Sequence, residues 1–122
     1  PFVDLALVPE AGSSLLAPAV LGRQQAFALL GLGEGLSAER AKAAGLIHDI
    51  VPEEELEAAA AAAARRIAQK PPEALRIARD LMLGDRSAVV GRIREEGEHF
   101  RARLKSDEAR NAFVAFMNRK KG

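Results

Sequence analysis

The chain has 122 residues, of which 48% are hydrophobic and 29% charged, and its formal net charge is +1 at pH 7. This length fits one domain or part of one, and the apolar fraction excludes a disordered chain. There is no Cys, which excludes disulfides, thiol catalysis and thiolate metal sites, and no apolar run approaches the roughly 18 residues of a transmembrane helix.

The first segment, PFVDLALVPEAGSS, combines a short apolar run with a stop and a turn. Residues 1–8 are expected to form a buried strand or an extended loop, because Pro9 disfavours the helical region for the residue before it. Ser13 or Ser14 is expected to cap a following helix. Glu10 would then stand between this extended segment and a helix, where its carboxylate can face a cleft. Alternatively, Glu10 only complements the dipole of that helix, and the local sequence leaves both interpretations open.

The middle of the chain predicts short helices separated by glycines. Pro18 and Gly22 are expected to split residues 15–30 into a short helical turn and a better helix from about Arg23 to Leu30. The glycine cluster at residues 31–35 follows a helix rather than a strand, so it is interpreted as a helix end and not as a phosphate loop. Ser37 is expected to cap a helix over residues 38–44, and residues 46–51 predict a short strand that stops at Pro52.

The second half predicts longer helices. Proline and acids open a helix after residue 52, Pro71 and Pro72 break it, and further helices are expected over residues 73–82, 87–104 and from 107 onward. His48 and His99 have no second His at metal-ligand spacing, so both are expected at the surface and no metal site is predicted. The chain should therefore be mostly helical, with one or two short strands that need neighbours outside it.

Charge is unevenly distributed along the chain. Residues 1–61 contain three Lys or Arg and nine Asp or Glu, a net −6, whereas residues 62–122 contain 15 and 8, a net +7. The basic half could meet an anionic ligand or an acidic partner. Nucleic acid is not expected, because acids are interleaved with the bases and no aromatic side chains are placed for base stacking.

Five stretches carry a resemblance to a known family, and together they cover nearly the whole chain. In order they are LVPEAGSS, LGRQQAFALLGLGEGLSAERAKAAGLI, IVP, PPEALRIARDLM and SDEARNAFVAFMNRKK. They resemble the C-terminal half of the crotonase superfamily, the enoyl-CoA hydratases and isomerases. The resemblance implies an α/β crotonase-like fold, a spiral of β-β-α turns, of which residues 1–52 would be the end of the core with the active-site loop. Residues 53–122 would be a helical region that covers coenzyme A and forms the oligomer.

The chain does not begin with Met, and we expect it to be a fragment or a processed piece of a longer protein. By the same resemblance, its oxyanion-hole donors lie in an N-terminal half that these residues do not represent. The fragment alone is therefore expected to be inactive.

The resemblance is closest to one branch of the family, the monofunctional Δ3,Δ2-enoyl-CoA isomerases. Hydratases of the family typically carry a second catalytic Glu after a proline at the place where this chain has Pro1 and Phe2. A phenyl ring cannot transfer a proton. The pattern PE followed by SS instead resembles the isomerases, in which the Glu of PE is the acid/base, and that role is carried over to Glu10 alone.

The resemblance also implies binding residues and partners. Phe2 and Leu15 are expected beside the acyl chain, and Phe116 and Arg119 fall at positions of the last helix that contact coenzyme A in relatives; alternatively, Phe116 is core and Arg119 a solvated tail. Phe27 and Phe113 are expected to pack. No cofactor is expected, because coenzyme A is part of the acyl-CoA substrate. A cytoplasmic homotrimer or homohexamer with no membrane partner is implied.

Two alternatives to the isomerase remain. One is a hydratase of the same family. The other is a non-catalytic piece that binds acyl-CoA or forms an oligomer, in which Glu10 is only a helix-dipole acid.

Overall fold

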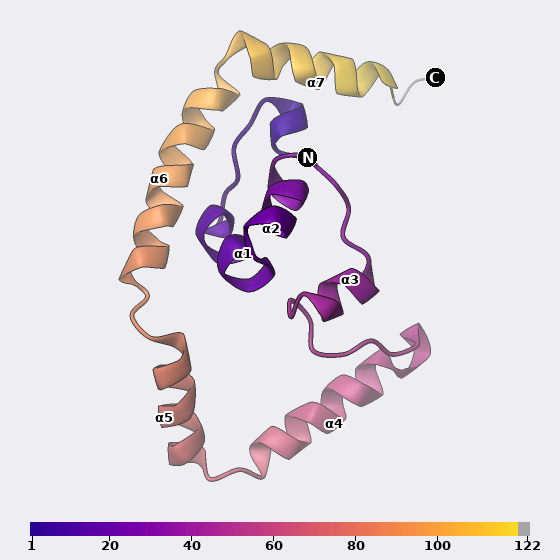
Figure 1. Cartoon of the computed structure of the whole chain (residues 1–122), viewed down its shortest axis with the longest axis vertical. Helices are drawn as coiled ribbons and strands as arrows, with labels where there is room; N and C mark the ends of the chain where they lie inside the picture. The colour runs from indigo at the N-terminus through magenta and orange to yellow at the C-terminus, as the bar shows by residue number, and fades with distance from the viewer. Residues whose placement is uncertain (120–122) are drawn as a thin grey trace.

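The computed structural model describes residues 1–119, and the side chains of residues 1–118. These residues form helices joined by turns, and no strand occurs among them (Figure 1). The elements are η1 (Val3–Leu5), α1 (Ser13–Leu21), α2 (Arg23–Leu30), α3 (Ala38–Ala43), η2 (Glu53–Glu55), α4 (Leu56–Ala68), α5 (Pro72–Leu83), α6 (Ser87–Leu104) and α7 (Asp107–Arg119).

The helices α1 and α2 form a packed pair, and the later helices curve around it. In Figure 1, α4, α5, α6 and α7 follow one another in an arc around α1 and α2. The arc returns to the start of the chain, where α6 contacts α1 and α7 contacts η1. The second half of the chain therefore holds the segment that contains Glu10.

The buried core of the described residues is small. Its apolar members are Leu7, Leu21, Ala26, Ala41 and Ala109. The only buried charged residue of the described chain is Glu96, on α6. A buried charge needs hydrogen-bond or ionic partners, and Glu96 is on the helix that contacts α1.

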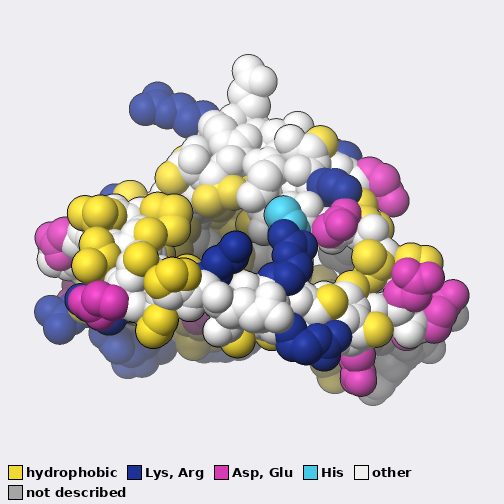
Figure 2. Space-filling model, turned by 90° about the horizontal axis from the view of Figure 1, so that it is seen from below, with side chains coloured by type: hydrophobic (Ala, Val, Ile, Leu, Met, Phe, Trp, Pro, Cys, Tyr) yellow, Lys and Arg dark blue, Asp and Glu magenta, His cyan; other side chains and the backbone are white. Residues whose placement is uncertain are grey.

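Helices α4 and α5 contribute no buried residue. Leu81 and Met82 of α5 are 78% and 79% exposed, and from the side of these helices many apolar side chains lie on the surface (Figure 2). Exposed apolar area of this kind is typical of a surface that meets another polypeptide. The predicted oligomer, and the predicted division of the chain after residue 52, stay predictions.

Most helix predictions are confirmed. The sequence pattern placed helices over residues 23–30 and 87–104, and α2 and α6 have these bounds. Ser37 caps α3 by accepting a hydrogen bond from the Arg40 amide at 3.2 Å. Pro18 lies inside α1 and does not end it.

The strand predicted over residues 1–8 is wrong. Residues 3–5 form a 3₁₀ turn, and the amide of Leu7 donates to the carbonyl of Phe2 at 2.8 Å. Ala6 turns the chain with a φ of 55°. The apolar run thus satisfies its backbone groups locally, whereas a strand would need a neighbouring strand to do so.

The strand predicted over residues 46–51 is also wrong. Gly45 has a φ of 78°, and the amide of Leu46 returns to the carbonyl of Ala41 at 2.9 Å, which closes α3. The carboxylate of Asp49 then accepts from the amide of Ile50 at 2.9 Å. These local bonds use the donors that a strand would offer to a partner.

Among the described residues no helix is both long and apolar enough to cross a lipid bilayer.

Candidate functional site

Glu10 lies on a short loop between η1 and α1, and its side chain is exposed. The two residues after it, Ala11 and Gly12, have left-handed φ angles of 60° and 78°. A non-glycine residue in this region costs about 1–3 kcal/mol and persists only where the surroundings fix it. The backbone beside Glu10 is therefore held in a strained conformation by its neighbours.

The carboxylate of Glu96 supplies the strongest of these restraints. It accepts hydrogen bonds from the Gly12 amide at 2.6 Å, the Ser14 amide at 2.9 Å and the Ser14 hydroxyl at 2.5 Å. The Arg92 guanidinium donates to the same hydroxyl at 3.1 Å. The bonds to Glu96 join residues 82 and 84 positions apart in the sequence, and two of them satisfy amides that the start of a helix leaves without partners.

The predicted serine cap of α1 is therefore wrong. No side-chain cap is made by the N-cap residue, Gly12, and the hydroxyl of Ser13 is buried without a hydrogen-bond partner among the described residues. Glu96 takes the place of a cap, because a carboxylate is favoured at the positive end of a helix.

The environment of Glu96 determines its charge. Burial acts to raise the pKa of Glu96, but the hydrogen bonds from Ser14 and Gly12 and the nearby Arg92 outweigh burial, so the pKa lies below its usual value. Each of these bonds favours the ionised form. Glu96 is thus an anion at neutral pH, which is the form that can accept from all three donors.

A second residue of α6 holds the other end of the loop segment. Arg103 donates from Nε to the carbonyl of Ala6 at 2.9 Å and forms an ion pair with Glu108 of α7. Arg103 follows Glu96 by seven residues, which is two helical turns or roughly 10 Å. Residues 6–14, which contain Glu10, are therefore attached to one helix at both ends.

Sequence reasoning interpreted α6 as a solvated charged helix and missed this role. Glu96 and Arg103 lie on the same face as Val89, Ile93 and Phe100, at alternating spacings of four and three. Such a stripe faces a packing partner. Val89 and Ile93 indeed lie where a Cβ added to Gly12 would meet them at 3.4 Å. An acid and a base on the apolar stripe were the signal that could have identified both residues.

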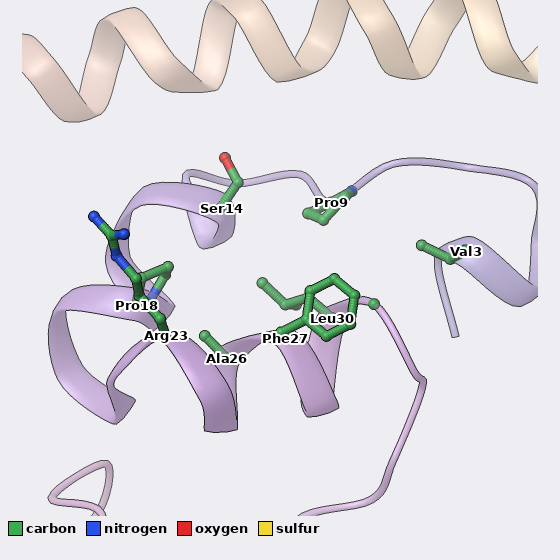
Figure 3. Close-up of a pocket in the computed structure, with 9 residues that line it drawn as sticks. Val3, Pro9, Ser14, Pro18, Arg23, Ala26, Phe27 and Leu30 are labelled. Carbon is green, nitrogen blue, oxygen red and sulfur yellow. The ribbon is translucent and has the colours of Figure 1, made fainter.

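An apolar cavity of about 320 Å³ lies beside the loop (Figure 3). Its wall includes Pro9, the residue directly before Glu10, and no carboxylate. In Figure 3 the side chains of Phe27 and Leu30 project together from α2 and Val3 lies on a separate segment, while the Ser14 hydroxyl points away toward α6. The lining residues are Val3, Pro9, Ser14, Pro18, Arg23, Ala26, Phe27, Leu30 and Gly31.

Phe27 and Phe113 are not packed as predicted. Phe27 is 65% exposed and lines the cavity, and Phe113 is 38% exposed. Phe27 therefore lies at the wall of this cavity and is largely uncovered by the described residues, whereas Ala26 of the same helix is buried.

The predicted site residues fall in two groups. Glu10 and Leu15 lie in the loop and the first turns of α1, but neither lines the 320 Å³ cavity.

Phe116 of α7 lines a separate hollow of about 300 Å³ together with Pro1, Asp4, Leu5 and Ala112. Phe2 is the N-cap of η1, next to this second group, and lines neither space. Arg119 ends α7, and its side chain lies outside the described residues. The site roles of all five residues stay predictions.

The histidines are exposed, as predicted. His48 lines a further cavity of about 250 Å³ with Arg66 and Lys70, a set of charges that suits an anion. No group of His, Asp and Glu arranged to hold a metal ion occurs among the described residues.

Comparison with known proteins gives consistent results. Residues 1–122 match the family described as Enoyl-CoA hydratase/isomerase. Enoyl-CoA delta isomerase 2 from Rattus norvegicus is 33% identical over 121 residues, which cover 98% of this chain and 31% of the relative.

Two solved structures superpose closely on the chain. An enoyl-CoA hydratase/isomerase from Pseudoalteromonas atlantica is 32% identical with a TM-score of 0.92, over 98% of this chain and 48% of the other. OdaA from Pseudomonas aeruginosa is 42% identical with a TM-score of 0.87, over 96% of this chain and 48% of the other. The chain thus spans about half the length of these structures and about a third of the rat relative.

These similarities confirm the crotonase-like fold, whereas the spiral of β-β-α turns stays a prediction for a chain whose described residues are helical. The match over all 122 residues and the close superpositions lead to one conclusion: the chain belongs to the enoyl-CoA hydratase/isomerase family.

Proposed function

We propose that the protein to which this chain belongs is an enoyl-CoA isomerase that moves the double bond of a 3-enoyl-CoA to the 2-trans position. Glu10 would be its proton carrier. The observation that carries the proposal is the position of Glu10. It directly follows Pro9, which lines an apolar cavity whose wall contains no carboxylate, and it lies on a strained loop that hydrogen bonds hold in place.

The reaction needs one group that both removes and returns a proton. The Glu10 carboxylate would take a proton from C2, the electrons of that bond would move into the thioester as a dienolate, and the same proton would return to C4. The double bond then lies between C2 and C3, and no cofactor or co-reactant is needed. One carboxylate on one side of the acyl chain can serve both carbons.

The dienolate must be stabilised by hydrogen-bond donors, each of which contributes about 2.7–4 kcal/mol in comparable sites. The amides of Gly12 and Ser14 are already bound to Glu96 and are not free for this purpose. The donors are therefore expected from other parts of the whole protein.

Two further facts support an isomerase over a hydratase. Hydration needs a water to be deprotonated and C2 to be protonated, for which the hydratases of the family use two acids, and Phe2 occupies the place of the second acid here. The rat relative that covers 98% of the chain bears the name delta isomerase. Acyl-CoA as the substrate, the homo-oligomer and the cytoplasmic location belong to the same proposal.

The test compares the full-length protein with its Glu10→Gln variant on a 3-enoyl-CoA. We expect kcat to fall by about 100- to 10,000-fold, which is the contribution of general acid–base catalysis, with binding of the substrate retained. Glu34→Gln, on an exposed turn after α2, is the matched control and should keep wild-type turnover. Equal turnover of Glu10→Gln and wild type would refute the proposal, and rapid hydration of a 2-enoyl-CoA would favour the hydratase.

A further inference from the structure

Glu96 is a buried anion on a helix distant in sequence from Glu10, and its carboxylate accepts hydrogen bonds from the Glu10 loop and the start of α1. A buried carboxylate is costly unless its partners are well placed. Here each oxygen has a donor, since one accepts from Gly12 and the other accepts twice from Ser14. The arrangement fixes the backbone two residues after Glu10.

We propose that Glu96 is a positioning residue for Glu10: it holds the strained Ala11–Gly12 turn and thereby sets where the Glu10 carboxylate stands. This inference rests on the proposed function of Glu10. Glu96 would not touch the substrate or transfer a proton, because its oxygens are occupied by the loop.

The geometry around the loop favours this role over general stabilisation. The left-handed Ala11 lies between Glu10 and the two amides that Glu96 holds, and the first of these amides belongs to the left-handed Gly12. Arg103 fixes the carbonyl of Ala6 on the other side, so the two anchors of α6 enclose the segment that carries Glu10. Release of one anchor lets the turn relax toward ordinary angles, which would rotate the backbone of Glu10.

Small displacements of a catalytic group have large kinetic effects: a shift of about 1 Å can cost about 100-fold in rate. For Glu96→Gln we expect kcat on a 3-enoyl-CoA to fall about 10- to 100-fold, with KM within about twofold. The glutamine amide keeps the size of the side chain but replaces one acceptor with a donor that faces the loop. Glu96→Asp keeps the charge on a shorter side chain and should give an intermediate kcat.

The control is Glu98→Gln, the same substitution two residues away on α6, at an exposed residue with no hydrogen bond to the loop. It should leave both kinetic constants unchanged. A thermal unfolding curve of each variant of the full-length protein shows whether it is folded at the assay temperature. If Glu96→Gln is unfolded there, Glu96→Asp decides: a lowered kcat with unchanged KM supports the role, and a wild-type kcat overturns it.

A double mutant separates positioning from a merely structural effect. If Glu96 acts through Glu10, adding Glu96→Gln to Glu10→Gln should change the residual rate by less than about twofold, because the group that was positioned is already gone. A further 10- to 100-fold fall in that background would overturn the inference, as would a wild-type kcat for Glu96→Gln alone.

The two proposals fail in different ways. If Glu10→Gln retains full turnover, the proposed function is wrong and the role of Glu96 falls with it. If Glu10→Gln is inactive and Glu96→Gln matches wild type, only the positioning role is wrong.

Discussion

Replacement of Glu96 by Ala should release the loop locally, and the amide exchange of that loop measures the release directly. The variant removes the acceptor of the buried Gly12 amide and of the Ser14 amide. A hydrogen bond to a charged group contributes about 1.5–3 kcal/mol, and a buried donor left without a partner costs a similar amount.

The expected magnitude follows from these two bonds. If water takes the place of the carboxylate at one of the two amides, one bond is lost and the free energy of local opening falls by about 2 kcal/mol. If water reaches neither amide, both bonds are lost and the free energy of local opening falls by about 4 kcal/mol. At about 1.4 kcal/mol for each factor of ten, amide exchange at Gly12 and Ser14 should become roughly 30- to 700-fold faster.

The assay is hydrogen–deuterium exchange on the full-length protein, read at residues 9–16, with Glu98→Ala as the matched control. The amides of α2, which do not contact Glu96, should keep their wild-type exchange. Exchange at Gly12 and Ser14 within threefold of wild type would mean that the carboxylate does not hold the loop, and the reasoning would fail.

Three further outcomes are expected. Because the pKa of Glu96 is lowered in the folded chain, its contribution to the free energy of unfolding is present above the ordinary value of 4.5 and is lost as the pH falls below that value. Urea unfolding across this pH range should show the loss, and Glu96→Gln should make the free energy of unfolding less dependent on pH. Ala11→Gly relieves a left-handed alanine and should raise the free energy of unfolding by roughly 1 kcal/mol in the same assay, despite the greater freedom of glycine in the unfolded chain. A destabilised Ala11→Gly variant would contradict the strain. Phe27→Ala should raise KM for an acyl-CoA by roughly 3- to 30-fold with little loss of stability, because Phe27 is exposed at the cavity wall; Leu32→Ala, exposed but outside that wall, is the control, and an unchanged KM for Phe27→Ala would separate this cavity from the substrate.

The helices could be predicted because their signals are local. Gly22 and Gly31 bound α2, and Ser37 caps α3. The strands could not be judged in the same way, because an apolar run shows only that a segment is buried or paired, and not with what. Residues 1–8 and 46–51 make local hydrogen bonds instead, through the Phe2 carbonyl and the Asp49 carboxylate.

The candidate site was predicted only in part. Glu10 was identified by resemblance, and it precedes α1 as predicted. It follows a turn and not a strand, however, and its exposed side chain does not line the cavity, so the expectation that it faces a cleft is not met there. The residues that hold the loop were missed because Glu96 lies 84 residues from Gly12, and hydropathy reasoning assigns a charged residue on a charged helix to solvent. The apolar cavity was missed because Phe27 was interpreted as core.

The conformational cost of the strained loop can be compared with the free energy of the hydrogen bonds that hold it. A left-handed Ala11 costs about 1–3 kcal/mol, whereas two amides bound to a buried carboxylate contribute about 3–6 kcal/mol against their loss. The anchors therefore outweigh the strain, and the loop adopts its shape because α6 is present. It follows that α6 has two unequal faces. Substitutions on the stripe that contains Val89, Glu96 and Arg103 should alter the Glu10 loop, whereas those on the opposite face should leave it unchanged.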